Sequence, residues 1–272
     1  MSIPTARPIV FITGANSGIG LEAVKAFLGS ADPYHILFGS RSVEKGEQAI
    51  QQVESEFPNS ATTIELVQVD LISDESIQTA FKKVSSKHDH IDALVNNAGG
   101  QFDNWLGNTS NTLRNSMNLA YDVNVAGTHV LTHTFVPLLL KSTLTPRLLF
   151  ITSGLSSLTS AETKFFPTSL DHSVPKGWPK EGFTLPIGYP CSKAALNMLM
   201  LGWKYALEGD GVKVWSLSPG FLATNLGGNI ELLKKMGAGD ASLGGIFIKD
   251  VVDGKRDGDH GKAIRREGVQ PW

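Results

Sequence analysis

The chain carries the segment Thr13-Gly14-Ala15-Asn16-Ser17-Gly18-Ile19-Gly20 close to its N-terminus. This segment joins a short apolar run, 9–13, to an amphipathic run, 19–29, so its glycines lie where a strand would turn into a helix. Three glycines at this spacing permit a tight turn and let the backbone approach a pyrophosphate, while the helix start offers free N–H groups to phosphate. The context therefore indicates a dinucleotide-binding loop rather than an ordinary turn.

Short β-rich apolar runs alternate with longer helical patterns along the rest of the chain. This alternation predicts an α/β fold, a Rossmann-type doubly wound parallel sheet of about seven strands with helices on both faces. The expected strands are 9–13, 36–39, 64–69, 91–96, 147–152, 212–217 and 262–266. The expected helices are 19–29, 43–57, 74–87, 113–140, 189–207 and 242–252.

The domain organisation follows from the absence of a linker between two cores. Residues 1–272 are expected to form a single NAD(P)-binding domain. Two segments interrupt the alternation, an insertion without periodicity at about 155–188 and a segment at about 221–245, glycine-rich from Gly227 to Gly245, that we expect to bind substrate. Loops of this length are usually functional.

Composition excludes several classes of protein. The net charge of -2 over 272 residues, with scattered basic side chains, gives no support for binding nucleic acid or an anionic membrane. With Cys191 as the single cysteine, no internal disulfide can form. The sequence shows neither a signal peptide nor a membrane-length apolar run, so a cytoplasmic protein is expected. No metal is expected, because no ligand-like grouping with carboxylates is evident for His88, His90, His129, His133 or His172.

The glycine loop, of the form TGxxxGIG, is followed by further motifs, and together they resemble the short-chain dehydrogenase/reductase family. The further motifs are, in order, Asn96-Asn97-Ala98-Gly99, Asn124, Ser153, Tyr189-Pro190-Cys191-Ser192-Lys193, and Ser218-Pro219-Gly220 with Thr224. The resemblance spans about 8–224 and implies hydride transfer with a nicotinamide cofactor. The cofactor-binding positions that it implies are Gly14, Asn16, Ser17, Gly18, Ile19, Gly20, Asp70, Leu71, Asn97, Ala98, Gly99, Tyr189, Lys193, Pro219, Gly220 and Thr224. For Asp70, capping of the following helix is the alternative role.

The end of the second expected strand favours NADP(H) over NAD(H). An acidic residue there would bind the adenosine 2′-hydroxyl, whereas an arginine accommodates the 2′-phosphate of NADP. Ser40 is neutral and Arg41 follows it, and a guanidinium suits a phosphate. A solvated role at the helix start is the alternative for Arg41. Ser17 stands where many NADP-using family members carry a second basic residue.

Tyr189 and Lys193 are spaced i, i+4, so a helix would place them on one face. Reduction of a ketone leaves an alkoxide that needs a positioned acid. The side chain of a free tyrosine has a pKa of about 10, and an adjacent ammonium would lower this pKa. The resemblance implies that Tyr189 is the general acid, that Lys193 assists it and binds the nicotinamide ribose, and that Ser153 binds the substrate oxygen. It also implies that Asn124 holds a water for proton relay.

Two details near the expected catalytic serine remain open. Ser156 is the alternative to Ser153, because several hydroxyl residues cluster there. The stretch between the serine and Tyr189 is longer than is usual in the family and resembles the insertion of monomeric carbonyl reductases, so a monomer is expected. The insertion's aromatic residues would either line a pocket for a bulky apolar or aromatic ketone or form their own small core; they are Phe165, Phe166, Trp178 and Phe183.

The expected function is that of an NADP(H)-dependent oxidoreductase of the carbonyl reductase type, which transfers a hydride between nicotinamide and a carbonyl or secondary alcohol and acts as a ketone or aldehyde reductase. One alternative is a non-redox enzyme of the same fold, such as an epimerase or a cyclase. The other is a non-catalytic cofactor sensor, against which the intact set Asn124, Ser153, Tyr189 and Lys193 argues.

Overall fold

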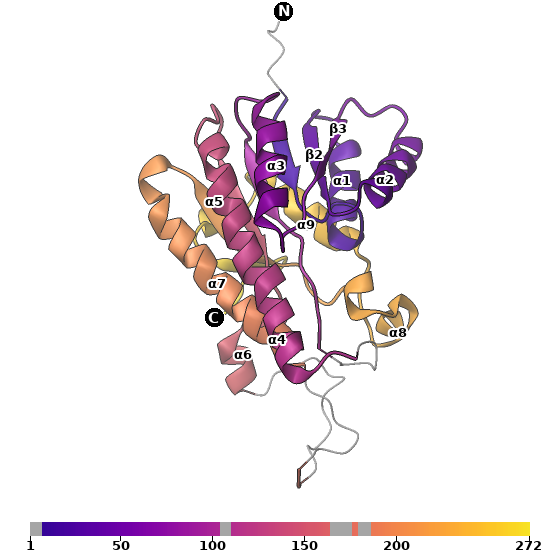
Figure 1. Ribbon diagram of the computed structural model, residues 1–272, viewed down its shortest axis with the longest axis vertical. Helices are drawn as coiled ribbons and strands as arrows, with labels where there is room; N and C mark the ends of the chain where they lie inside the picture. The colour runs from indigo at the N-terminus through magenta and orange to yellow at the C-terminus, as the bar shows by residue number, and fades with distance from the viewer. Residues whose placement is uncertain (1–6, 104–109, 164–175, 179–185) are drawn as a thin grey trace, which may run out of the picture.

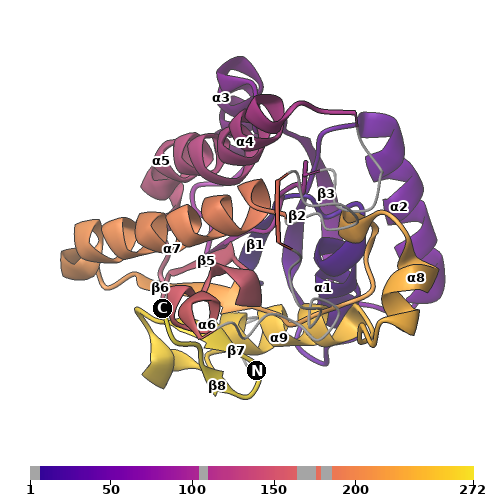
Figure 2. The same cartoon turned by 90° about the horizontal axis from the view of Figure 1, so that it is seen from below.

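All eight strands of the computed structural model belong to one sheet (Figures 1 and 2), and the structure describes residues 7–103, 110–163, 176–178 and 186–272. The strand order is β3-β2-β1-β4-β5-β6-β7-β8, parallel except for the pairing of β7 with β8. The strands are β1 (Ile9–Ile12), β2 (His35–Ser40), β3 (Thr63–Gln68), β4 (Ala93–Asn96), β5 (Arg147–Ile151), β6 (Lys213–Ser218), β7 (Ala263–Arg265) and β8 (Gly268–Val269). The order reverses between β1 and β4, and ligands of such sheets bind at the carboxyl ends beside this reversal.

Helices cover both faces of the sheet, which runs between the two groups in Figure 2. One face carries α1 (Gly18–Leu28), α2 (Val43–Glu56) and α9 (Ser242–Val252). The other carries α3 (Asp74–Ser85), α4 (Leu113–Tyr121), α5 (Thr128–Leu139) and α7 (Gly188–Ala206). The short helices α6 (Leu158–Glu162) and α8 (Ile230–Lys235) lie in the segments that follow β5 and β6. Among the described residues, no helix is both long and apolar enough to cross a membrane.

The core consists of two apolar layers, one on each face of the sheet. Strands that are buried on both faces need apolar side chains at every position. In β5, Leu148 and Phe150 enter the layer beneath α3, α5 and α7, whereas Leu149 and Ile151 enter the layer beneath α1 and α9. The β5 residues Arg147–Ile151 are all buried. The sheet is thereby a rigid support for residues at its carboxyl edge.

The structure confirms the predicted fold class, and the expected strands and helices agree with it to within two residues at each end. The expected helix 113–140 is divided, because a π-helical turn at Asp122–Gly127 separates α4 from α5. The sequence did not predict β8, α6 or α8, which are only two to six residues long. Of the insertion's aromatics, Trp178 is exposed, while Phe165, Phe166 and Phe183 lie outside the described residues.

Candidate active site

The glycine loop lies at the carboxyl end of β1, packed against the residues that follow β4. Gly14 has a φ of +63°, and a Cβ atom there would lie 2.9 Å from the Cα of Ala98. At Gly20 a Cβ would lie 2.4 Å from the carbonyl oxygen of Gly14. A side chain at either position would therefore force the backbone apart, and the open loop fits a ligand that needs close backbone approach.

Thr13 and Asn97 fix the loop to β4. Asn97 Nδ2 donates to the carbonyl oxygens of Thr13 at 2.8 Å and Gly14 at 3.2 Å. The Thr13 hydroxyl accepts from the backbone N–H groups of Asn97 at 3.1 Å and Ala98 at 3.0 Å. Thr13 was not among the predicted site residues. Its position just before the first glycine was the signal that could have indicated it.

The start of α1 is where the sequence predicts a phosphate site. Ser17 is the exposed N-cap residue, and its hydroxyl makes no cap hydrogen bond. Asn16 is half-buried beside it, and Ile19 packs at the border of the core. A Cβ at Gly18 would lie 3.6 Å from the Cβ of Thr224, so the fold brings this distant predicted residue to the loop.

Two predicted cofactor-binding positions, Asp70 and Leu71, follow β3. Asp70 Oδ1 accepts from the Ile72 N–H at 3.3 Å, while Ser73 is the N-cap of α3 and accepts from the Ser76 N–H at 3.1 Å. The alternative role of Asp70 as helix cap is therefore wrong. The Leu71 side chain is buried in the apolar layer, so only its backbone can face a ligand.

Arg41 directly follows β2, and its side chain is exposed. In the described part of the chain the guanidinium has no ion-pair partner.

The predicted positions after β6 also lie at the carboxyl edge, where Pro219 is buried and Gly220 has a φ of +104°. The residues present thus fit a dinucleotide at the carboxyl edge of the sheet.

Tyr189 and Lys193 lie near the start of α7, and both are buried, with 9% and 4% of their surfaces exposed. Lys193 Nζ donates to the Ile151 carbonyl oxygen at 2.8 Å and lies 5.7 Å from the centroid of the Tyr189 ring. A Cβ at Gly99 would lie 3.2 Å from the same Nζ. Gly99 of the NNAG motif and the YxxxK pair therefore meet at one place.

Burial governs the charge state of this pair. It raises the pKa of Tyr189 to about 12, while a hydrogen bond with Ser153 acts in the opposite direction. It lowers the pKa of Lys193 to about 8. The net shift of the tyrosine pKa is upward, opposite to the lowering that was expected, because loss of hydration on burial outweighs the effect of Ser153. The phenol remains protonated at neutral pH, as a proton donor must be.

Asn124 is fully buried within the π-helical turn. Its Nδ2 donates to the Gly100 carbonyl oxygen and to the Ser192 hydroxyl, both at 2.9 Å, and its Oδ1 accepts from the Gly100 N–H at 2.8 Å. Both amide hydrogens are thus engaged, and only a second lone pair of Oδ1 is left for the predicted relay water. The contacts show that Asn124 fixes the NNAG segment against α7.

The structure distinguishes the two candidate serines. Ser156 is buried, and its hydroxyl donates to the Ser153 carbonyl oxygen at 2.6 Å while accepting from Asn197 Nδ2 at 2.9 Å and Gln270 Nε2 at 3.2 Å. Ser153 is only half-buried, its hydroxyl accepts from the Leu155 N–H at 3.2 Å, and it acts on the Tyr189 phenol to lower the pKa of that group. The hydroxyl of Ser153, not that of Ser156, is therefore available beside the tyrosine.

Comparisons with known proteins show the family of this chain. The family model described as short chain dehydrogenase matches residues 8–169. The short-chain dehydrogenase/reductase tropE of Talaromyces stipitatus is 44% identical over 270 residues, which cover 98% of each chain. The chain belongs to the short-chain dehydrogenase/reductase family. The similar eupG of a Phoma species is 44% identical over 273 residues, covering 97% of each chain.

Solved structures share the fold of this short-chain dehydrogenase/reductase. The NADPH-bound carbonyl reductase from chicken fatty liver aligns with a TM-score of 0.75 at 24% identity, covering 98% of this chain and all of the other (100%). The carbonyl reductase Sniffer of D. melanogaster aligns with a TM-score of 0.74 at 19% identity, with coverage of 98% and 100%. At these identities the likeness shows the fold alone.

Asp103 is a site residue that the sequence did not indicate in this short-chain dehydrogenase/reductase. Its Oδ1 accepts from the Gly188 N–H at 2.9 Å and its Oδ2 from the Tyr189 N–H at 2.8 Å. The carboxylate thus satisfies two free donors at the N-terminus of α7, where negative charge is favoured. It also fixes the backbone of Tyr189 from a segment far away in the sequence.

We expect Asp103→Ala to lower kcat about 10- to 100-fold, because a small displacement of a reacting group has effects of this size. Asp103→Asn, which keeps one acceptor, should have a smaller effect, and the KM for the cofactor should change little in both. Steady-state kinetics with NADPH and a carbonyl substrate checks this. The exposed Asp89, changed to Ala, is the control, and equal kcat values for all variants would contradict the role.

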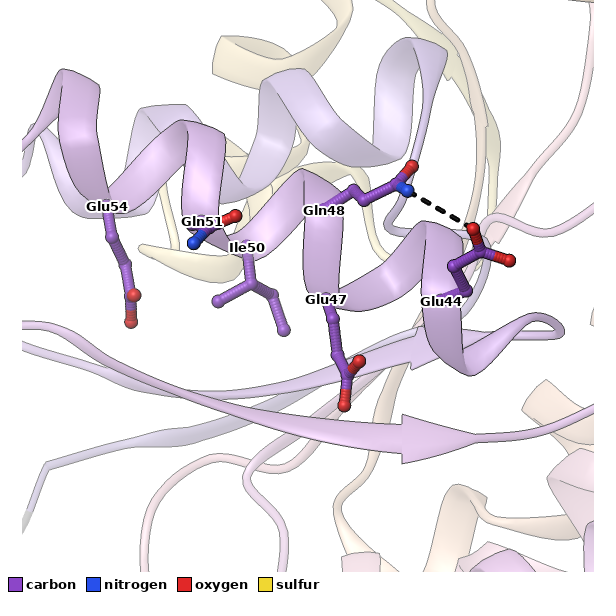
Figure 3. Close-up of a pocket in the computed structure, with 6 residues that line it drawn as sticks. All are labelled: Glu44, Glu47, Gln48, Ile50, Gln51 and Glu54. Atoms are coloured by element: carbon purple, nitrogen blue, oxygen red, sulfur yellow. Dashed lines mark hydrogen bonds between the residues drawn. The ribbon is translucent and has the colours of Figure 1, made fainter.

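A separate surface depression lies along α2 (Figure 3), on a helix rather than at the carboxyl edge of the sheet. Gln48 Nε2 donates to Glu44 Oε1 at 3.4 Å within it. Its lining comes from one helix and includes three carboxylates, which would repel an anionic cofactor. The lining residues are Glu44, Glu47, Gln48, Ile50, Gln51 and Glu54.

Proposed function

We propose that this short-chain dehydrogenase/reductase is an NADP(H)-dependent reductase of ketones or aldehydes. The observation that carries the proposal is the convergence of Ser153, Tyr189 and Lys193 beside the glycine loop at the carboxyl edge of the sheet. The glycine loop and the start of α1 would hold the pyrophosphate, and Lys193 would hold the ribose. When bound, the cofactor supplies a hydride to the carbonyl carbon.

The side chains would orient the substrate and move one proton. The hydroxyl of Ser153 acts on the Tyr189 phenol, so a carbonyl oxygen placed beside both hydroxyls would accept from both. As negative charge develops on that oxygen, the Tyr189 hydroxyl transfers its proton there and the alcohol forms. The Lys193 ammonium then stabilises the phenolate until the tyrosine regains a proton.

The unpaired Arg41 supports NADP(H) as the cofactor, as does the neutral Ser40 at the end of β2. Arg41→Ala is expected to raise the KM for NADPH about 10- to 100-fold, because a hydrogen bond to a charged group contributes about 1.5–3 kcal/mol. The KM for NADH should hardly change, since NADH lacks the 2′-phosphate. Lys82→Ala, on the exposed surface of α3, is the matched control. A similar change with both cofactors would contradict the assignment.

The direct test is loss of NADPH absorbance over a panel of ketones and aldehydes, with the alcohol product identified by mass spectrometry. Consumption of NADPH with formation of alcohol supports the reductase. Conversion of a substrate without net oxidation of the cofactor would support an epimerase or a cyclase instead. Tight NADPH binding without any conversion would support a sensor.

The substrate and the assembly are part of the same proposal. A bulky apolar or aromatic ketone remains the expected substrate class, so the panel includes aryl ketones and small polar ketones for comparison. The chain remains predicted to be a monomer, and a sedimentation mass of two or four chains would contradict this.

A further inference from the structure

A cluster of two histidines and one glutamate lies at the β2–β3 edge of the sheet. His35 is the first residue of β2, Glu65 lies within β3, and His88 follows the end of α3. In the register of the two strands His35 pairs with Thr63. Thr63 and Glu65 are two residues apart in β3, so the side chains of His35, Thr63 and Glu65 share one face of the sheet. The helix α3 packs against β3 (Figure 1), and His88 lies three residues beyond the last residue of that helix, Ser85.

The potential ligand atoms of the cluster lie within 4.8 Å of one another. Glu65 Oε2 is 3.1 Å from His88 Nε2 and 3.8 Å from His35 Nε2. Tetrahedral zinc with ligands at about 2.0–2.1 Å separates its ligand atoms by only a little over ~3 Å. Small side-chain rotations would therefore bring the three atoms to zinc-binding positions. The sequence prediction that His88 has no grouping with a carboxylate is wrong, because strand register creates the grouping.

Contacts around the cluster orient the His35 ring and the Glu65 carboxylate as metal ligands. His35 Nδ1 lies 2.8 Å from the Thr63 hydroxyl, a contact that can fix the ring with its Nε2 lone pair toward Glu65. That Nε2 atom is buried and has no hydrogen-bond partner. A buried polar atom without a partner is costly, so a metal ion bound at this nitrogen would satisfy it. Lys87 Nζ holds Glu65 Oε1 at 2.8 Å and leaves Oε2 toward the histidines.

We propose that His35, Glu65 and His88 bind a zinc ion, with water in the fourth position. Imidazole and carboxylate are ligands that zinc prefers in proteins. The three side chains are between 16% and 22% exposed, which leaves a path for the ion and for its water. The cluster begins at the amino end of β2, whereas Tyr189 lies at the carboxyl edge of the sheet. The ion would therefore link β2 and the edge strand β3 to the segment that follows α3, and it would stabilise the fold without entering catalysis.

The test is zinc binding to the full-length chain after treatment with a chelator, measured by calorimetry and by the rise in the unfolding temperature. One equivalent of zinc should bind, and Co²⁺ in its place should give the intense visible absorption of a tetrahedral site. Glu65→Gln and His88→Ala should remove both signals. Thr63→Val should weaken binding about 10- to 100-fold, as loss of an outer-shell contact typically does.

The matched control is the double variant His129→Ala/His133→Ala, which removes an exposed pair of histidines on α5. It should bind zinc like the unaltered chain. Loss of binding in this control, with binding retained in Glu65→Gln, would overturn the proposal, as would absence of stoichiometric binding to the unaltered chain. Circular dichroism of the metal-free variants shows whether each one folds, so a folding defect is not mistaken for loss of a ligand.

Discussion

Replacement of Tyr189 by Phe is expected to lower kcat/KM for carbonyl reduction about 10²- to 10⁴-fold, the contribution typical of a positioned general acid. The change removes only the hydroxyl, and the buried ring keeps its place on α7. Ser153 would still hold the carbonyl oxygen but would have no neighbouring phenol to supply the proton. Steady-state rates with saturating NADPH measure the loss.

The control for this variant lies on the same helix. Tyr205 is 82% exposed near the end of α7, so Tyr205→Phe should leave the rate unchanged. NADPH binding, followed by fluorescence, should persist in Tyr189→Phe, because the glycine loop is intact. Equal rates for the two variants would show that Tyr189 is not the acid, whereas loss of NADPH binding would indicate a folding defect.

The parts of the site that the sequence predicted are those whose signals are local. A glycine loop between a strand and a helix can be identified from adjacent residues, since its spacing reflects close backbone contacts such as that of Gly20 with Gly14. The pair Tyr189 and Lys193 lies one helical turn apart, so one helix suffices to bring them together. Ser153 was placed by the register of a single strand.

The parts that the sequence did not predict depend on contacts between distant segments. Asp103 binds the start of α7 from the loop after β4, and nothing in its neighbouring residues indicates this. Gln270 Nε2 donates to the Ser153 carbonyl oxygen at 3.3 Å from near the C-terminus. The cluster of His35, Glu65 and His88 requires two strands in register and one helix end. Only the assembled sheet reveals such groupings.

The pH dependence of reduction separates the roles of Lys193 and Tyr189. With a pKa lowered to about 8, Lys193 is an ammonium below that pH and neutral above it. Tyr189, with its pKa raised to about 12, stays protonated through the same range. We therefore expect kcat/KM at limiting NADPH, which reports groups of the free enzyme, to be constant below pH 8 and to fall as the pH rises through about 8.

Variants of Lys193 identify the group responsible for that fall. Lys193→Met removes the charge and should lower the rate at every pH, to a degree like that of Tyr189→Phe. Lys193→Arg keeps a charge that does not titrate below pH ~12, so its residual activity should no longer fall near pH 8. A fall that persists in Lys193→Arg would belong to another group. A fall that disappears would show that the positive charge beside the buried phenol, and not the phenol's own ionisation, limits reduction in alkaline solution.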